Sequence, residues 1–434
     1  MDYTDEIYSK LVRKGLDEVV VEQSDSQVHQ IRFSESTKDL FNTWGESTIS
    51  VFASSGKRVA NAAIKDYSRI DELVEEIAGL CSKVPENPEF MGINHEKASL
   101  GAQEVTPLDS EKVMEYARSM IDGSVEFGSE RSAGVVYSRF SRIHLRSGYN
   151  DLVYDRGGTE LVIRSFIGEY SGQESFHFGP GLSLPAVDPG EMGRSAAETA
   201  RKGRDVRQGD EGKLTVLMSP YVLGNILSCS GGFLSSHMAR TGLSPFMNRL
   251  GEDVASENVT LVDDPTDRSG EGVRPVDDEG TPTRKNTLIK KGRLKTFLHS
   301  YSTAELNSTE STGNAGILFP VPWQLKLEKG TESMEDMLSE IKDGLFINNT
   351  WYTRFQDYRN GVFSTVPRDG VFRIKDGRIQ ESWSGIRISD SVLNILGNVS
   401  KVSRETKNTK WWLEIEPSIM PYALVENVNI TRSF

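Results

Sequence analysis

The chain repeats one local pattern, in which two runs of alternating apolar and polar residues flank a short turn that contains glycine. The pattern occurs at 45–64, 285–301 and 370–385, where the turns contain Gly-Lys, Lys-Gly and Asp-Gly. Alternation places successive side chains on opposite faces of a strand, and glycine adopts the backbone conformation that a tight hairpin needs. The chain is therefore predicted to be rich in antiparallel strands.

Helical patterns interrupt the strands, mainly in the first half. Residues 69–84 have an amphipathic apolar stripe, which predicts a helix that buries Cys81 in a core. Alternation at 28–33 places Val28, Gln30 and Arg32 on one face and His29, Ile31 and Phe33 on the other. Further helices are predicted at 1–16, 108–124 and 189–205, and 151–169 is predicted to be two strands broken at Arg-Gly-Gly-Thr.

The length of 434 residues exceeds what one compact core usually holds and suits two domains of roughly 200 residues each. We expect an α+β fold, with an antiparallel sheet and helices in an N-terminal domain at 1–210. A β-rich, sandwich-like or barrel-like domain is expected at 211–434, because glycine turns and short strands dominate there.

Composition excludes several classes of protein. A net charge of −13 without a basic stripe would repel nucleic acid, so we expect no such partner. No apolar run approaches the roughly 18 residues of a membrane span, and the N-terminal stretch lacks the order of a secretory signal. Two cysteines argue against a disulfide framework. We therefore expect a cytoplasmic protein that does not contact membranes.

Residue spacing alone reveals no catalytic constellation. The six histidines are scattered without a zinc-binding pair, and His177 is expected to be an outward-facing strand residue. The acidic clusters at 263–267 and 277–283 lack calcium-loop spacing and are expected to be solvated turns. No nucleophile elbow or phosphate loop is complete.

One stretch, 223–242, begins as a buried helix and continues through serine, cysteine and two glycines, which are poor helix formers. We expect a single helix there. The segment 251–316, which follows this stretch, suggests a reason for its unusual composition.

The segment 251–316 contains Val-Ala-Ser, Asp-Asp-Glu-Gly-Thr-Pro-Thr, the Leu-Ile-Lys-Lys-Gly-Arg-Leu hairpin and Ser-Thr-Gly-Asn-Ala in this order. On these motifs it resembles the TldD/PmbA (TldE) family, whose members carry the label of DNA gyrase modulators and are regarded as metallopeptidase components. Weaker similarity extends to both sides. The segment 355–374 departs from the family pattern, and its role stays open.

In the TldD type of this family, a His-Glu-x-x-x-His helix supplies two zinc ligands and a general base, and a cysteine near the C-terminus supplies another ligand. Spacing places that motif over Ser228, Cys229 and Phe233, while 408–428 contains no cysteine. These side chains cannot replace two imidazoles and a carboxylate. The resemblance therefore implies a subunit of the TldE/PmbA type, with no catalytic residue, no bound metal and no cofactor.

The expected function is that of a subunit which supports peptide binding and proteolysis in a complex with a TldD-like metallopeptidase. Its substrate would be a peptide or an unfolded polypeptide. One alternative is a homodimeric peptide-binding or scaffold protein. Another is a metal-independent hydrolase with Cys229 or Ser228 as nucleophile, activated by a distant histidine such as His237 or His299. Residual activity, the choice between homodimer and heterodimer, and the substrate are left open by the sequence.

Overall fold

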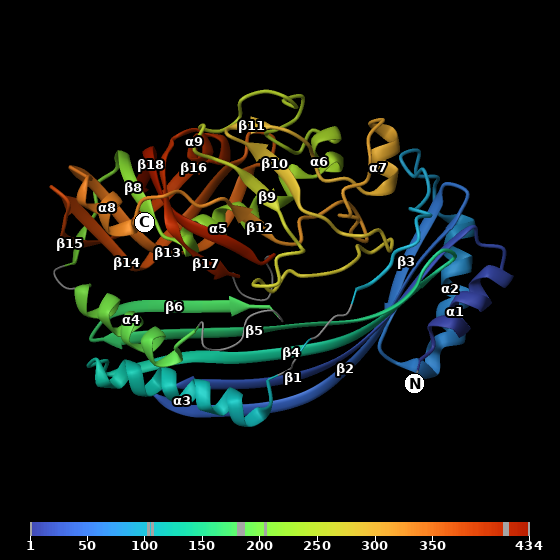
Figure 1. Cartoon of the computed structure of the whole chain (residues 1–434), viewed down its shortest axis with the longest axis horizontal. Coiled ribbons are helices and arrows are strands. Elements are labelled where there is room, and N and C mark those ends of the chain that lie inside the picture. Colours follow the sequence, from blue (N-terminus) through green and yellow to red (C-terminus); the bar gives the residue numbers. More distant parts are fainter. Residues whose placement is uncertain are drawn as a thin grey trace.

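The chain has an α+β fold built on two sheets. The structure is a computed structural model that describes residues 2–101, 105, 108–179, 187–203, 206–410 and 416–432. A six-stranded antiparallel sheet occupies the first half and a twelve-stranded mixed sheet the second. Figure 1 shows the first sheet as a long curved layer, with the second half of the chain above its concave side.

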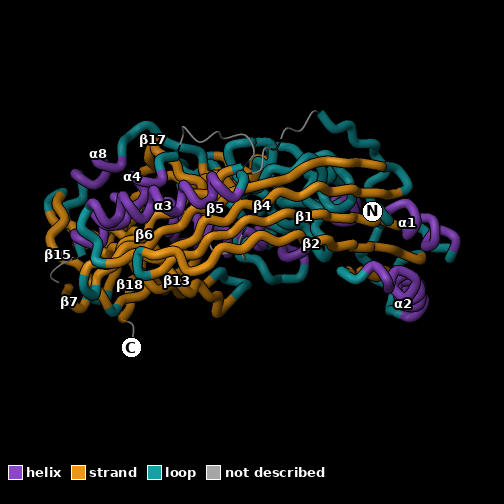
Figure 2. The backbone as a smooth tube through the Cα atoms, turned by 90° about the horizontal axis from the view of Figure 1, so that it is seen from below, coloured by secondary structure: helices purple, strands orange, loops and turns teal. Residues whose placement is uncertain are grey.

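The first sheet has the strand order β3-β2-β1-β4-β5-β6. Its strands are β1 (Glu18–Ser34), β2 (Thr37–Ser55), β3 (Arg58–Ile64), β4 (Arg131–Ser147), β5 (Asp151–Ile167) and β6 (Tyr170–Phe178). The helices are α1 (Thr4–Arg13), a 3₁₀ turn η1 (Tyr67–Arg69), α2 (Ile70–Lys83), α3 (Ser110–Glu126) and α4 (Pro189–Lys202). Figure 2 shows α3 and α4 across the outer face of this sheet at one end and α1 and α2 at the other.

Alternation along the strands separates an apolar outer face from a polar inner face. Ile31 and Phe33 are buried in one core with residues of α3 and α4, whereas Gln30 and Arg32 line a cavity on the inner side. The predicted division of residues 28–33 between two faces is confirmed. Cys81 is buried in the core beneath α1 and α2, also as predicted.

The predicted break within 151–169 is wrong. β5 is continuous, and Gly157 and Gly158 pair with Phe140 and Arg139 of β4. A Cβ atom on Gly158 would lie 2.3 Å from Cγ of Glu271, so glycine here admits a residue of the second half close to the strand. The two glycines therefore serve a close approach within a sheet rather than a turn.

The second half has a large mixed sheet with short helices. Its strands are β7 (Val206–Gln208), β8 (Gly212–Met218), β9 (Leu261–Asp263), β10 (Asn286–Lys290), β11 (Arg293–Leu294), β12 (Leu325–Leu327), β13 (Asp343–Asp357), β14 (Val362–Lys375), β15 (Arg378–Ser384), β16 (Ile386–Ser391), β17 (Val399–Thr409) and β18 (Ser418–Arg432). The helical elements are α5 (Pro220–Cys229), the 3₁₀ turn η3 (Gly231–Leu234), α6 (Ser236–Arg240), α7 (Tyr301–Leu306), α8 (Met334–Ser339) and α9 (Val392–Gly397).

Five of these strands close a ring of pairings, because β8 pairs β13, β13 pairs β14, β14 pairs β16, β16 pairs β18 and β18 pairs β8. The second half is thus barrel-like, as predicted. The three predicted hairpins are also present. At two of them the turns, Lys291-Gly292 and Asp376-Gly377, have positive φ at both residues, the conformation that matches the twist of paired strands.

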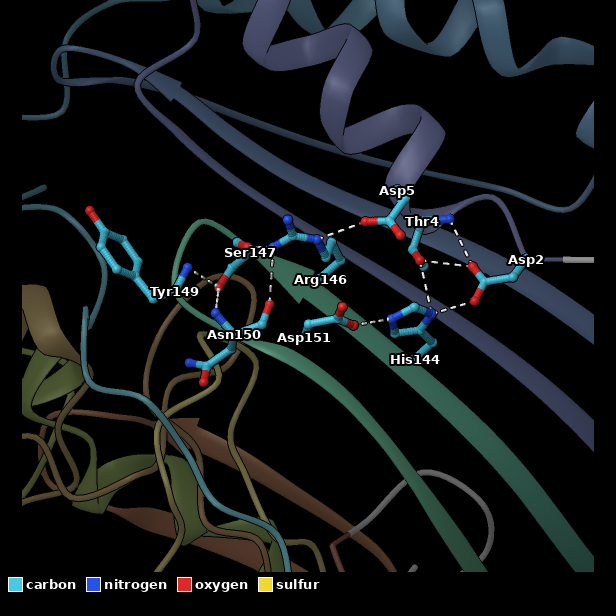
Figure 3. A network of polar contacts seen from close by, with 9 residues as sticks. All are labelled: Asp2, Thr4, Asp5, His144, Arg146, Ser147, Tyr149, Asn150 and Asp151. Carbon is cyan, nitrogen blue, oxygen red and sulfur yellow. Dashed lines mark hydrogen bonds and ion pairs between the residues drawn. The ribbon is translucent and has the colours of Figure 1, made fainter.

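A polar network fixes the N-terminal helix to the hairpin of β4 and β5 (Figure 3). Thr4 and His144 lie 2.9 Å apart from Oγ1 to Nδ1, and the same ring contacts Asp2. The other ring nitrogen of His144 lies 2.7 Å from a carboxylate oxygen of Asp151. Burial alone would lower the pKa of His144, but hydrogen bonds with Asp151 and Asp2 together raise it above its ordinary value.

No helix within the described ranges is long and apolar enough to cross a membrane. The cytoplasmic location stays a prediction.

Candidate functional site

The stretch 223–242 is not one helix, so that prediction is wrong. α5 begins after Ser219, whose hydroxyl accepts hydrogen bonds from the backbone N–H groups of Tyr221 and Val222, and Pro220 occupies the first turn. The helix ends at Cys229, and η3 and α6 follow as separate short pieces. Gly231 and Gly232 explain the break, because glycine disfavours a continued α-helix.

The three positions that align with the zinc motif therefore lie on two elements. Ser228 and Cys229 are in the last turn of α5, and Phe233 is in η3. Cys229 is a half-buried free thiol, and burial raises its pKa to about 11. Phe233 is only 3% exposed. A protonated thiol, a hydroxyl and a phenyl ring do not fit a zinc ion, so no step of a reaction is derived through one.

The ring of Phe233 packs against residues of the segment that departs from the family pattern. Its centroid lies 4.8 Å from that of Phe355, in an edge-to-face arrangement, and 6.0 Å from that of Tyr358. Phe233 and the segment 355–374 are thus in direct contact. Both belong to one aromatic cluster at the end of α5.

Neither histidine suggested as a base contacts the candidate nucleophiles. His237 lies 3.6 Å from a carboxylate oxygen of Glu89 and stacks on Phe319. His299 is buried, and burial lowers its pKa to about 4. Within the described part of the chain, no group of three or more His, Cys, Asp or Glu side chains has the arrangement of a metal site.

The first acidic residue of each cluster expected to be a solvated turn, Asp263 and Asp277, is fully buried, which corrects that expectation. The carboxylate of Asp263 accepts hydrogen bonds from the backbone N–H groups of Trp323 and Gln324 at 2.8 and 2.7 Å. The carboxylate of Asp277 accepts hydrogen bonds from the backbone N–H groups of Thr281 and Ala315, each at 2.9 Å. Burial raises the pKa of Asp263 to about 6 and that of Asp277 to about 7. These carboxylates organise loops of the second half.

His177 was expected to face outward, and this is also wrong. It lies on β6 but is only 1% exposed. Its Nδ1 atom is 3.6 Å from a carboxylate oxygen of Glu271, which belongs to the second half. Burial would raise the pKa of Glu271, but Lys410 and His177 lower it to about 2. Charged groups therefore meet where the second half approaches the inner face of the first sheet.

A second polar link holds β6 against the second half. Lys407 of β17 forms an ion pair with Glu174 of β6, and the hydroxyl of Tyr221 donates a hydrogen bond to the same carboxylate. The Tyr221 hydroxyl also lies 2.8 Å from the carbonyl oxygen of Ser175. Burial raises the pKa of Tyr221, and the neighbouring carboxylate adds to this effect. α5 is thereby connected directly to the first sheet.

Two cavities lie between the inner face of the first sheet and the second half. One has a volume of about 630 Å³ and is lined by residues such as Val162 and Trp351. The other has a volume of about 610 Å³ and a polar lining that includes Ser24 and Trp323. Lys410 lines both cavities. The inner face of the sheet is therefore hollowed rather than packed as a core.

The sequence-based predictions did not include these cavities. Their residues lie far apart in the chain, and only the fold brings Arg139, Glu271 and Lys410 to one place. One signal was available. The inner-facing positions of β1, such as Ser24 and Gln30, are polar, whereas the face of a sheet that packs into a core is apolar.

The fold and the arrangement of the second half define a class of protein. The family model described as the PmbA/TldA metallopeptidase C-terminal domain matches residues 211–432. The chain belongs to the PmbA/TldD family.

Several curated relatives are named as metalloproteases. The chain is 30% identical to a metalloprotease of Methanocaldococcus jannaschii over 201 residues, which is 45% of this chain and 44% of the relative. It is 30% identical to a metalloprotease TldD homolog of Buchnera aphidicola over 203 residues, 43% of this chain and 41% of the relative. The match thus spans less than half the length of either relative.

Solved structures share the whole fold. A candidate modulator of DNA gyrase from Thermotoga maritima superposes with a TM-score of 0.84 at 21% identity, covering 99% of each chain. TldE from Thermococcus kodakarensis superposes with a TM-score of 0.82 at 20% identity, covering 99% of this chain and 100% of the other. At this level of identity the likeness concerns the fold alone.

Proposed function

We propose that this chain is a TldE-like subunit without its own zinc centre, which supports peptide binding and proteolysis by a TldD-like metallopeptidase. The observation that carries the proposal is the contact between Phe233 and the divergent segment 355–374. An aromatic cluster around the buried ring of Phe233 occupies the position where the resemblance implies a metal ligand. We further propose that the chain divides into domains at 1–210 and 211–434.

The two cavities support the peptide-binding part of the proposal. A sheet that is apolar on its outer face and hollow on its inner face leaves space that side chains of this chain do not fill. One cavity presents apolar and the other polar surface, so an extended polypeptide could place side chains of both kinds. Extended peptides also bind by strand addition, in which main-chain hydrogen bonds accept many sequences.

A homodimeric peptide-binding or scaffold protein is the second candidate function. The whole-fold likeness to a candidate gyrase modulator of Thermotoga maritima is equally compatible with it. A metal-independent hydrolase is the third. The raised pKa of Cys229 and the positions of His237 and His299 disfavour it, because a cysteine nucleophile needs a nearby base and a lowered pKa.

Co-expression with a TldD-like subunit carrying the intact zinc motif tests the proposal. We expect one peak at the mass of the complex in size-exclusion chromatography, and peptidase activity above that of the catalytic subunit alone. Two separate peaks without a gain in activity would refute the heteromeric function. A peak of this chain alone at twice its mass would then favour the homodimer.

Activity of the chain by itself distinguishes the hydrolase. We expect none toward a peptide pool. If activity is found and is lost in Cys229→Ala or Ser228→Ala, the hydrolase is correct and the proposal is wrong.

A further inference from the structure

The polar cavity on the inner face of the first sheet is lined by four cationic and four anionic side chains, and only some of them form ion pairs with described residues. Two of its lysines are paired, since Lys65 forms an ion pair with Glu46, and Lys410 lies 2.6 Å from Glu271. Two of its arginines, Arg139 and Arg156, have no carboxylate within ion-pair distance among the residues that the structure describes. Nearby surface arginines differ in this respect, because Arg142 is paired with Asp155.

The two unmatched arginines have few other partners. The guanidinium of Arg139 donates hydrogen bonds only to hydroxyl groups, those of Ser26 at 3.0 Å and Ser141 at 3.1 Å. Arg156 makes no hydrogen bond to any described residue. Burial and the neighbouring Arg274 lower the pKa of Arg156. The charges of Glu22 and Asp278 offset part of this effect without forming an ion pair, so hydrogen bonds to an external anion would stabilise Arg156 further.

Strand register places the two arginines side by side. Arg139 of β4 pairs with Gly158 of β5, and Arg156 pairs with Ser141, so the arginines are diagonal neighbours on the inner face. Diagonal neighbours on paired strands lie about 7 to 8 Å apart, which two long side chains can span to contact one anion. Residue 158, opposite Arg139, is glycine and places no side chain there, and Glu271 of the second half lies against it.

The surroundings favour a small, singly charged anion. Hydroxyl groups of Ser24, Ser26 and Ser141 line the same cavity and can donate further hydrogen bonds. Four carboxylates line it as well and would oppose a strongly charged group, namely Glu22, Glu46, Glu271 and Glu416. A carboxylate suits both features, since guanidinium groups bind it in a bidentate geometry and hydroxyls complete its shell.

We infer that this cavity is a subsite for a peptide carboxylate, held by Arg139 and Arg156. The inference rests on the proposed peptide binding and adds a chemical preference to it. The carboxylate can come from the C-terminus of the peptide or from an aspartate or glutamate side chain. The cavity volume of about 610 Å³ leaves room for the adjoining residues of a peptide.

Equilibrium dialysis of the full chain against three peptide pools, read by mass spectrometry, tests the inference. The first pool has random sequences without Asp or Glu and a free C-terminus. The second has the same sequences with an amidated C-terminus. The third is amidated and has one Glu in each peptide. We expect the wild-type chain to retain the first pool, the third or both about tenfold better than the second, because a hydrogen bond to a charged group contributes at least this factor.

Variants assign the preference to the two arginines. In Arg139→Gln and in Arg156→Gln the advantage of the carboxylate pools should fall about tenfold, while retention of the amidated neutral pool stays unchanged. The matched control is Arg142→Gln, since Arg142 lies on the same strand, faces the opposite side and has a 64% exposed side chain. It should retain the full preference.

The outcomes separate this inference from the proposed function. Equal retention of all three pools by the wild-type chain would overturn the carboxylate subsite and leave peptide binding intact. Retention of none of them would overturn both. A preference that survives in Arg139→Gln and Arg156→Gln would show that the carboxylate binds elsewhere. The wild-type comparison decides the inference even if a variant does not fold.

Discussion

Replacement of Phe233 by alanine should strongly destabilise the second half of the chain. The side chain is 3% exposed and packs edge to face on Phe355. Truncation of a buried phenylalanine to alanine costs about 3 to 5 kcal/mol, and an aromatic pair contributes about 1 kcal/mol beyond burial. We therefore expect Phe233→Ala to lower the free energy of unfolding by about 4 kcal/mol. Phe233→Leu, which keeps most of the volume, should cost about 1 to 2 kcal/mol.

Urea denaturation followed by circular dichroism measures these differences through the midpoint and slope of the transition. Tyr358→Ala is the matched control. It removes a ring that contacts Phe233 but is 50% exposed, so it should cost less than about 1.5 kcal/mol. A loss below about 1 kcal/mol in Phe233→Ala would refute the proposal that Phe233 serves core packing where the family resemblance implies a ligand.

Three further predictions concern charged and titratable groups. Lys407→Met should lower the free energy of unfolding by about 2 to 4 kcal/mol, because it leaves the carboxylate of Glu174 buried without a cation. In urea denaturation, adding Glu174→Gln to the same chain should restore at least half of this loss. Asp2 and Asp151 favour the charged form of the His144 ring, which raises its pKa in the folded state. The stabilisation that His144 contributes should therefore be full below its unfolded pKa of 6.5 and disappear as the pH rises through the raised folded pKa. The difference in unfolding free energy between wild type and His144→Gln should therefore be larger at pH 5.5 than at pH 8.5, and a difference that grows with pH would contradict it. Alkylation of Cys229 by iodoacetamide at pH 8, followed by peptide mapping, should be about a hundredfold slower than that of a free cysteine, because a pKa of about 11 leaves little thiolate.

Local patterns predicted much of the fold correctly. Turn residues and alternation located the hairpins at 45–64, 285–301 and 370–385, since a two-residue turn with positive φ is encoded by glycine and its neighbour. The helix that buries Cys81 was predicted from its apolar stripe. The sequence predicted a barrel-like second half only in general terms. No local pattern specifies which strands pair, as β16 does with β18.

The sequence-based predictions were wrong for residues whose structural role depends on a contact with a residue far away in the chain. Gly157 and Gly158 suggested a turn, but they lie in a continuous strand, where Gly158 admits Glu271 and Gly157 admits Val105. Asp277 suggested a solvated turn, but its carboxylate holds backbone N–H groups inside the second half. His177 is buried because the second half covers β6. Each of these roles requires a tertiary contact that no spacing rule encodes.

The family resemblance indicated which positions correspond to the zinc motif, but it did not predict how the side chains at those positions pack. The sequence predicted one helix for Ser228, Cys229 and Phe233, whereas α5 ends at Cys229 and Phe233 lies in η3. The packing of Phe233 on the divergent segment 355–374 appears only in the fold. That contact connects two departures from the family pattern that were independent observations in the sequence.

The zinc content of the purified chain tests the central claim most directly. After exposure to excess zinc and removal of unbound metal, inductively coupled plasma mass spectrometry should find fewer than about 0.1 zinc ions per chain, because a hydroxyl, a protonated thiol and a phenyl ring provide no ligand set. About one zinc ion per chain, retained in wild type and lost in Cys229→Ala, would contradict the proposal that this chain has no metal centre of its own.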